Sequence, residues 1–296
     1  MKVTAVIVTF NRLVLLQKTL DYVRMTPLVT HIIVVNNGST DGTTEWLDTQ
    51  ADLEVIHQDN VGGSGGFYTG MKAAYESGSD WIWCMDDDVC PRPDCLNFLI
   101  DADMHGVGIL CPRRIMGEEV FVTECRYLNL IDPFSSLHLD KVEPYICHLV
   151  SIQGMVFEGP LIKRSTIERI GYPNKDLFIF YDDTDYAYRA VLAGLQVLYV
   201  PNALMYKERF YNNDTWAERQ RKKKWKRFYQ VRNGAYFNHH YGKNFLIRYL
   251  RPLQETLGYI FLAFFTAPFT KAYSWRDIPR FWRMYLDGIH ERLGKL

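Results

Sequence analysis

The segment Trp81-Ile-Trp-Cys-Met-Asp86-Asp87-Asp88 places three carboxylates directly after a run of five apolar residues. An apolar run of this length predicts a buried β-strand, and clustered carboxylates repel one another unless a cation neutralises them. Hard ions such as Mg²⁺ or Mn²⁺ bind carboxylate oxygens and are commonly shared with substrate phosphates. Because side chains alternate along an extended chain, Asp86 and Asp88 share one face. The segment predicts a strand that ends in a divalent-cation site, and the alternative is a solvated acidic turn.

Three more apolar segments precede this strand, and stretches with helical spacing separate them. A β-α-β-α succession of this kind predicts a mostly parallel sheet covered by helices on both faces. Ligands of such sheets bind beyond the carboxyl ends of the strands, where this chain has polar or glycine-rich segments. The predicted strands are residues 3–9, 31–35 and 53–57, and the predicted helices are residues 12–25, 43–50 and 70–76.

The pattern becomes less regular after residue 106, and it changes character again after residue 212. From residue 213 onward the chain has a helical pattern and is rich in basic and aromatic residues. We therefore expect one α/β domain over residues 1–212 and a helical subdomain over residues 213–296. Within the first, the pattern predicts strands at 108–111, 147–157 and 196–200 and helices at 164–170 and 185–193.

The segment Asn60-Val-Gly-Gly-Ser-Gly-Gly-Phe67 contains four glycines in five positions. Glycine permits close backbone approach and a positive φ, so we expect a loop here that leads into the helix at 70–76. Consecutive exposed N–H groups before a helix N-terminus bind anions such as a pyrophosphate. The spacing matches neither the dinucleotide-binding nor the Walker A pattern. The segment therefore favours a diphosphate site that differs from both of these patterns, and the alternative is a flexible loop without a ligand.

A second acidic segment, Phe178-Ile-Phe-Tyr-Asp182-Asp183-Thr-Asp185, is predicted to be an aromatic strand followed by a helix. An attacking hydroxyl group needs its proton removed, and a carboxylate within hydrogen-bond reach can accept that proton. One carboxylate of this segment is therefore a candidate general base. The alternative is structural, with Asp182 or Asp183 capping the helix and Asp185 pairing with Arg189 at i,i+4 spacing.

Charge is distributed unevenly along a chain whose net charge is zero. Residues 201–296 carry 19 Lys/Arg against 7 Asp/Glu, whereas residues 1–200 carry 15 against 27. This asymmetry predicts a cation-binding front half and a back half attracted to phosphate-rich surfaces. The six cysteines form no CxxC pair, so we expect reduced thiols and no thiolate metal site. The segment from Met1 to Arg12 predicts a first strand and neither a signal peptide nor an anchor.

The back half combines the basic segment Arg219–Arg227, the uncharged apolar segment Leu257–Phe269 and an amphipathic pattern over Ile278–Leu293. Seven basic residues in nine attract anionic lipid at about 1 kcal/mol per charge, and nucleic acid is the rival ligand. The chain shows no nucleic-acid recognition motif, and membrane association explains both other segments. Because thirteen residues are too few to span a bilayer, we expect an interfacial helix. The predicted location is peripheral, at the cytoplasmic face of the cell membrane, and the last helix could also dock on a second copy of the chain.

Together these motifs resemble glycosyltransferase family 2 over roughly residues 1–240. The resemblance rests on Val-Thr-Phe-Asn-Arg from Val8, Asn-Asn-Gly-Ser-Thr-Asp-Gly-Thr from Asn36, the three aspartates, and Asp-Asp-Thr-Asp from Asp182. The glycine-rich segment and Tyr229-Gln-Val-Arg-Asn233 look most like the galactofuranosyltransferases, with rhamnosyltransferases as near relatives. The resemblance implies an inverting, nucleotide-sugar-dependent enzyme with a GT-A fold. It also implies UDP-galactofuranose as donor and a lipid-linked or cell-surface glycan as acceptor.

The same resemblance implies roles for individual residues. Asp183 would be the catalytic base, and Asp86 and Asp88 would hold the metal, Mn²⁺ or Mg²⁺. Tyr181 and Asp182 would contact the acceptor. The residues implied for the nucleotide and the donor are Thr9, Phe10, Arg12, Asn37, Asn60, Gly62, Gly63, Ser64, Gly65, Asp86 and Asp87.

One position departs from the pattern that the resemblance implies. Galactofuranosyltransferases of this kind often place a metal-binding His after the base helix, where this chain has Pro201-Asn-Ala-Leu-Met-Tyr-Lys207-Glu208. Lys207 could supply a positive charge to the donor diphosphate, or water and phosphates could complete the metal's ligands.

The alternative functions are a dTDP-rhamnose-dependent transferase and a non-catalytic scaffold of a membrane glycan-assembly complex. A sugar nucleotidyltransferase would need a glycine-rich loop with Arg and Lys, which residues 4–16 lack.

Overall fold

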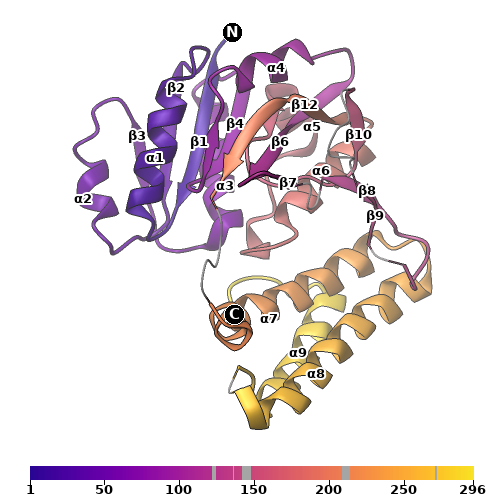
Figure 1. Cartoon of the computed structure of the whole chain (residues 1–296). Coiled ribbons are helices and arrows are strands. Elements are labelled where there is room, and N and C mark those ends of the chain that lie inside the picture. The colour runs from indigo at the N-terminus through magenta and orange to yellow at the C-terminus, as the bar shows by residue number, and fades with distance from the viewer. Residues whose placement is uncertain (122–124, 136, 142–147, 209–213, 271) are drawn as a thin grey trace. The chain divides into compact units, whose positions relative to one another are not determined.

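The computed structural model describes residues 1–121, 125–135, 137–141, 148–208, 214–270 and 272–296, and it divides into two compact units (Figure 1). The larger unit comprises Met1–Tyr127, Asp140–Lys175 and Asp182–Glu208. The smaller unit comprises Leu128–Leu139, Asp176–Tyr181 and Arg209–Leu296.

The larger unit is built around a ten-stranded sheet whose main order is β10-β12-β6-β11-β4-β1-β2-β3. The pairs β1–β2, β1–β4, β2–β3 and β6–β12 are parallel, whereas β11 runs antiparallel between β4 and β6. The predicted mostly parallel sheet is therefore confirmed. Its strands are β1 (Val3–Thr9), β2 (His31–Asn36), β3 (Glu54–His57), β4 (Trp81–Asp86), β5 (Val89–Pro91), β6 (Val107–Met116), β7 (Glu119–Phe121), β10 (Val150–Ile152), β11 (Leu161–Lys163) and β12 (Gln196–Lys207), while β8 (Arg126–Leu128) and β9 (His138–Lys141) pair separately.

Helices cover both faces of the sheet, because the central strands are apolar on both sides. On β1, Val3, Ala5 and Ile7 belong to one core cluster, and Val6 and Val8 belong to the other. The first cluster includes residues of α1 (Leu13–Arg24), α2 (Thr43–Leu47) and α4 (Cys95–Asp101). The second includes residues of α3 (Gly62–Glu76), α5 (Arg164–Ile170) and α6 (Asp182–Leu192).

The expected loop at residues 60–67 is wrong, because α3 begins at Gly62 and the glycines form its first turns. A Cβ atom on Gly66 would lie 2.5 Å from Val8 Cγ1, and one on Gly70 would lie 2.3 Å from Val6 Cγ1. The glycines thus let the helix pack directly against β1. Each glycine costs a helix about 1 kcal/mol relative to alanine, and this close packing overrides the low propensity.

The expected aromatic strand before Asp182 is also wrong. A 3₁₀ turn, η1 (Lys175–Leu177), stands there, followed by three residues with left-handed backbones. Those residues are Phe178, Phe180 and Tyr181, with φ angles of 67°, 68° and 66°. The strand expected at 147–157 is shorter, since β10 covers Val150–Ile152 and Cys147 lies outside the described residues. Five free cysteines are buried, namely Cys84, Cys90, Cys95, Cys111 and Cys125.

The smaller unit is helical, as the sequence predicts for the C-terminal region. It contains α7 (Trp216–Tyr241), a π-helical turn η2 (Leu246–Leu250), α8 (Arg251–Thr270) and α9 (Asp277–Ile289). A capping box starts α7, where Thr215 Oγ1 accepts from Glu218 N. Apolar side chains of α7, α8 and α9 form the core of this unit, among them Phe228, Ala263 and Phe281. Across the described residues, no helix combines the length and apolar character needed to cross a membrane.

Candidate active site

Three carboxylates gather beyond the carboxyl end of β4. Asp86, Asp88 and Glu158 each offer one oxygen, and these oxygens lie within 4.8 Å of one another. Mg²⁺ binds oxygens at about 2.1 Å, so ligands on opposite sides of one ion lie about 4.2 Å apart. The hard oxygen donors and their spacing therefore fit a single divalent ion. Asp86 and Asp88 share the cluster, but Asp86 ends β4 and Asp88 lies in the turn that follows, so the turn and not strand alternation brings them together.

Glu158 was not predicted from the sequence, and the turn that carries it is fixed against β4. Gly159 N donates to Cys84 O at 2.9 Å, and Trp83 Nε1 donates to Gly159 O at 2.9 Å. Gly159 itself has a φ of +98°, which favours glycine at this position. The signal available in the sequence was a lone carboxylate inside the otherwise uncharged segment 155–160.

Two buried cations neutralise part of this acidic cluster. Lys207, on β12, places Nζ 3.2 Å from Asp88 Oδ1 and 2.5 Å from Glu158 Oε1. Arg114, on β6, places Nη1 2.5 Å from Glu158 Oε2. The Lys207 side chain is only 3% exposed, so its ammonium is shielded from water. A divalent ion that binds the cluster would compete with this ammonium for Asp88 and Glu158.

The protonation of the cluster reflects a balance between burial and neighbouring charge. Burial raises the pKa of Asp86 well above its usual value, and the carboxylates of Asp88 and Glu158 add to the rise. Burial alone would raise the pKa of Glu158, but Arg114 and Lys207 outweigh burial and lower it. Burial also lowers the pKa of Lys207, whereas the carboxylates around it raise that pKa overall. The cluster is therefore suited to hold an additional positive charge.

Asp87 faces a separate set of partners at the end of β1. Thr9 Oγ1 donates to Asp87 Oδ2 at 2.7 Å, and Arg12 Nη1 donates to Asp87 Oδ1 at 3.0 Å and to Asp88 Oδ2 at 2.8 Å. Burial raises the pKa of Asp87 to about 6, although Arg12 and Thr9 oppose the rise. The structure thus brings the first sequence motif to the aspartates. Phe10, in the same motif, is 43% exposed and available to a ligand.

Asn37 and Asn60, expected at the nucleotide, lie between the end of β2 and the start of α3. Asn37 is buried, and its Nδ2 donates to Gly62 O at 2.9 Å while its Oδ1 accepts from Gln58 Nε2 at 2.9 Å. Asn60 Oδ1 accepts from Gly62 N at 3.0 Å. Both side chains therefore position the first turn of α3. A Cβ on Gly63 would meet no atom within 4 Å, so this helix start, whose N–H groups suit an anion, is open there.

The carboxylates of the second acidic segment open α6, as expected. Burial raises the pKa of Asp182 to about 6, and hydrogen bonds from backbone N–H groups partly offset the rise. Asp183 is half-buried, and its Oδ1 accepts from the next backbone N–H at 2.6 Å. Asp185 pairs with Arg189 at 2.9 Å, which confirms the structural alternative for that residue.

Tyr181, expected at the acceptor, belongs to the turn before α6 and to the smaller unit. Its ring lies 5.5 Å from that of Phe237. In the same unit, the fully buried Asn233 uses Nδ2 to donate at 2.9 to 3.0 Å to three carbonyl oxygens, those of Leu177, Ile179 and Phe180. The motif that ends at Asn233 therefore holds the left-handed turn in place.

Comparison with known proteins gives a consistent result for the larger part of the chain. A family model described as Glycosyl transferase family 2 matches residues 4–187. Galactofuranosyltransferase GlfT1 of Mycobacterium tuberculosis is 29% identical over 214 residues, and GlfT1 of Mycolicibacterium smegmatis is 30% identical over 212 residues. Each alignment covers 65% of this chain and 66% of the relative, so the chain spans just under two thirds of their length. An undecaprenyl-phosphate mannosyltransferase of Micrococcus luteus is 32% identical over 122 residues, which is 40% of this chain and 50% of that protein.

Solved structures with the same architecture are more distant in sequence. GalNAc-T7, solved with UDP, GalNAc and Mn²⁺, aligns with a TM-score of 0.58 at 14% identity and covers 94% of this chain and 56% of that one. TarS of S. aureus, residues 1–349, aligns with a TM-score of 0.56 at 13% identity and covers 99% of this chain and 82% of that one. At these identities the likeness establishes a GT-A-like fold.

Proposed function

Because the chain belongs to glycosyl transferase family 2, we propose that it moves galactofuranose from UDP-galactofuranose onto a lipid-linked or cell-surface glycan, with inversion at the anomeric carbon. The observation that carries the proposal is the cluster of the half-buried Asp86 and Glu158 with the buried Asp88 at the carboxyl ends of the strands. In α/β sheets this edge is where ligands bind. The similarity to two galactofuranosyltransferases supports the choice of donor sugar.

In the proposed reaction, an acceptor hydroxyl oxygen bonds to the anomeric carbon as the bond from that carbon to the diphosphate oxygen breaks. Asp183 accepts the hydroxyl proton, and UDP leaves with the electron pair. The half-buried Asp183 stands in the first turn of α6, where the helix dipole stabilises its carboxylate. Arg12 and the open start of α3 would offset the charge that develops on the diphosphate.

A divalent ion is part of the proposed site, because the three cluster carboxylates suit Mn²⁺ or Mg²⁺ better than a softer metal. When bound, such an ion supplies positive charge to a leaving diphosphate. Asp86, Asp88 and Glu158 would hold it, and Lys207 contributes a permanent positive charge beside them. The two charges are expected to act on the same carboxylates.

Membrane association of the smaller unit is the second part of the proposal. On α8, four phenylalanines spaced three, one and four residues apart share one face and are more than half exposed, namely Phe261, Phe264, Phe265 and Phe269. Exposed apolar faces of this kind mark interaction sites rather than ordinary surface. The basic first half of α7 adds attraction to anionic lipid headgroups. These features support a peripheral position at the cytoplasmic face, where a lipid-linked acceptor would be presented.

The proposal is tested by calorimetric titration of the whole chain with UDP and with dTDP, each with Mn²⁺ and with EDTA. We expect UDP to bind in a metal-dependent way and dTDP to bind at least tenfold more weakly. Preference for dTDP would favour the rhamnosyltransferase alternative, and binding of neither nucleotide would favour a scaffold. Asp183→Asn is expected to retain UDP binding and to lose transfer by about 100-fold or more, the range of general-base catalysis. Unchanged transfer by this variant would remove Asp183 from the role of base.

A further inference from the structure

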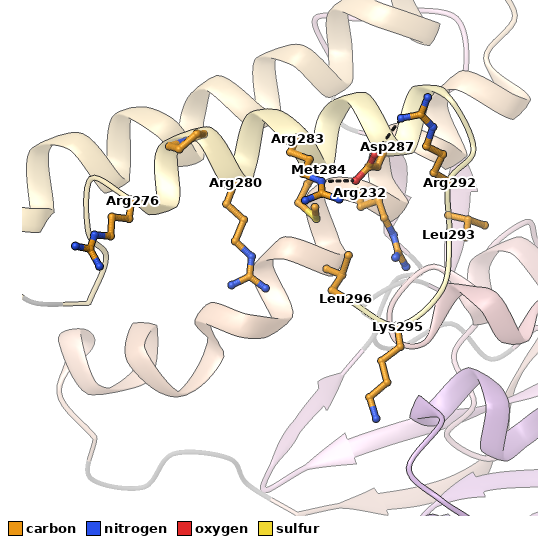
Figure 2. A pocket seen from close by; sticks show the side chains of 11 residues that line it. Arg232, Arg276, Arg280, Arg283, Met284, Asp287, Arg292, Leu293, Lys295 and Leu296 are labelled. Atoms are coloured by element: carbon orange, nitrogen blue, oxygen red, sulfur yellow. Dashed lines mark ion pairs between the residues drawn. The ribbon is translucent and has the colours of Figure 1, made fainter.

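The smaller unit contains a cavity of about 660 Å³ along α9 and the residues that follow it (Figure 2). This volume lies within the range of small-molecule binding sites. One carboxylate, Asp287, faces it. The basic side chains that line it are Arg232, Arg276, Arg280, Arg283, Arg292 and Lys295. Such an excess of positive charge in one cavity points to an anionic ligand.

The periodicity of α9 gathers much of this charge on one face. Arg276, Arg280, Arg283 and Asp287 follow one another at spacings of three or four residues, which places them on the same side of the helix. Asp287 is shared by two arginines, with distances of 3.5 Å to Arg283 and 3.8 Å to Arg292. Arg276 and Arg280 form no ion pair with any residue that the structure describes. Asp287 therefore neutralises only part of the positive charge of this wall.

Arg232 provides a second and independent observation, because it is a buried cation with neutral partners. It is 1% exposed. Its Nη2 donates to Leu177 O at 3.2 Å, its Nε donates to Asn233 Oδ1 at 2.9 Å, and its Nη1 donates to Gly294 O. Burial lowers the pKa of Arg232. Tyr229, Asp287 and Asp176 oppose this lowering only in part. Burial of the guanidinium therefore remains costly, and an anion in the cavity would add opposite charge.

We propose that this arginine-lined cavity binds the phosphate group of a membrane lipid. Guanidinium groups bind phosphate oxygens in pairs, which suits a wall of arginines. The cavity also has apolar walls from Pro279, Met284 and Leu293, which fit the uncharged part of a lipid better than a free inorganic anion. The inference rests on the proposed membrane association of this unit and names the site and the headgroup chemistry.

Two tryptophans beside the arginines favour a lipid over a soluble phosphate. Trp275 is 64% exposed and precedes Arg276, and Trp282 is 43% exposed and precedes Arg283. Exposed tryptophans concentrate at the boundary between headgroups and water in membrane-bound proteins. A phosphomonoester carries about −1.5 to −2 charges at pH 7, so the cavity is expected to prefer phosphatidic acid to the phosphodiester phosphatidylglycerol.

The test is binding of the whole chain to vesicles of phosphatidylcholine that contain either phosphatidic acid or phosphatidylglycerol at equal surface charge. The cavity variant is Arg276→Gln with Arg283→Gln, both exposed positions. The matched control is Arg219→Gln with Arg221→Gln, exposed basic residues of α7 outside the cavity. Each pair removes two charges and is expected to weaken binding to any anionic vesicle by about 30-fold, the equivalent of about 1 kcal/mol per charge. The discriminating quantity is therefore the preference for phosphatidic acid.

We expect the wild type and the control to bind phosphatidic acid about tenfold more tightly than phosphatidylglycerol, and the cavity variant to lose this preference. A cavity variant that keeps the preference would overturn the proposal. The lipid assignment would also be overturned by a second outcome. In that outcome the protein binds inorganic pyrophosphate through Arg276 and Arg283 and shows no preference between the two kinds of vesicle. UDP titration of the same proteins reports on the larger unit separately. Absent UDP binding would therefore remove the proposed transferase and leave the lipid result standing.

Discussion

Replacing Lys207 by Met tests whether its ammonium neutralises the acidic cluster. The side chain is 3% exposed and lies 3.2 Å from Asp88 Oδ1 and 2.5 Å from Glu158 Oε1. Removing one partner from a buried ion pair costs about 3–5 kcal/mol, because the remaining charge stays buried without a counterion. Arg114 still pairs with Glu158 in the variant. We therefore expect the free energy of unfolding in EDTA to fall by about 3 kcal/mol, the lower end of that range.

A divalent ion should reverse much of this loss, because it can replace the missing positive charge. A ligand at 100 times its dissociation constant stabilises a folded protein by about 2.7 kcal/mol. In the wild type the ammonium competes for the same oxygens, so Mn²⁺ is expected to stabilise Lys207→Met more than the wild type. The measurement is urea unfolding in EDTA and in Mn²⁺. Intrinsic fluorescence follows the unfolding, and the buried Trp81 and Trp83 of β4 contribute to it together with the other five tryptophans of the chain.

The matched control is Lys72→Met, which removes an ammonium from an exposed pair with Glu76 at 3.8 Å on α3. Exposed ion pairs contribute about 0–1 kcal/mol, so this variant should lose little stability and respond to Mn²⁺ as the wild type does. The reasoning would be refuted by Lys207→Met with wild-type stability in EDTA. A response to Mn²⁺ no larger than that of the wild type would refute it equally.

Three further changes test packing and titration. Asn233→Ala removes the donors of two to three neutral hydrogen bonds, each worth about 1 kcal/mol. Urea unfolding should therefore show a free energy of unfolding that is lower by about 2–3 kcal/mol. A decrease of less than 1 kcal/mol would contradict the role of Asn233 in the turn. Asp182 has a pKa of about 6 in the folded protein, above the ordinary value of 3.8 for an aspartate. The stability of the wild type relative to Asp182→Asn should therefore fall by up to about 3 kcal/mol as the pH rises from about 4 to 6. A difference that does not change with pH would exclude this titration. Gly70→Ala should lose about 1–3 kcal/mol by overpacking Val6. The open Gly63→Ala should lose nothing and gain up to about 1 kcal/mol of helix propensity, and equal losses would contradict the packing argument.

The parallel sheet was predictable because its signal is local. Each central strand is a continuous apolar run, and a strand buried on both faces needs such a run. The first turns of α3 were not predictable in the same way. Glycine disfavours helix on propensity alone, and the packing that overrides it depends on Val6 and Val8, some 60 residues earlier in the chain.

In the candidate site, too, the local features were predictable from the sequence and the long-range contacts were not. Asp86 and Asp88 stand at the end of one strand, so their closeness was predictable from their sequence separation, although a turn and not strand alternation brings them together. Glu158 and Arg114 reach the same cluster only because β11 inserts antiparallel between β4 and β6. Periodicity indicates that a strand exists, but it does not indicate its neighbours. The His missing near Lys207 was visible from the sequence, whereas the pairing of Lys207 with two carboxylates required the fold.

The left-handed turn before α6 is a part of the fold that the sequence did not predict. Residues other than glycine in this conformation cost about 1–3 kcal/mol each, and such conformations persist where surrounding contacts fix them. Phe178, Phe180 and Tyr181 adopt it, and the buried Asn233 holds the carbonyl oxygens of the same turn. The next residues along the chain are Asp182 and Asp183. A turn held at this cost depends on the contacts of Asn233, so Asn233→Ala is expected to release it.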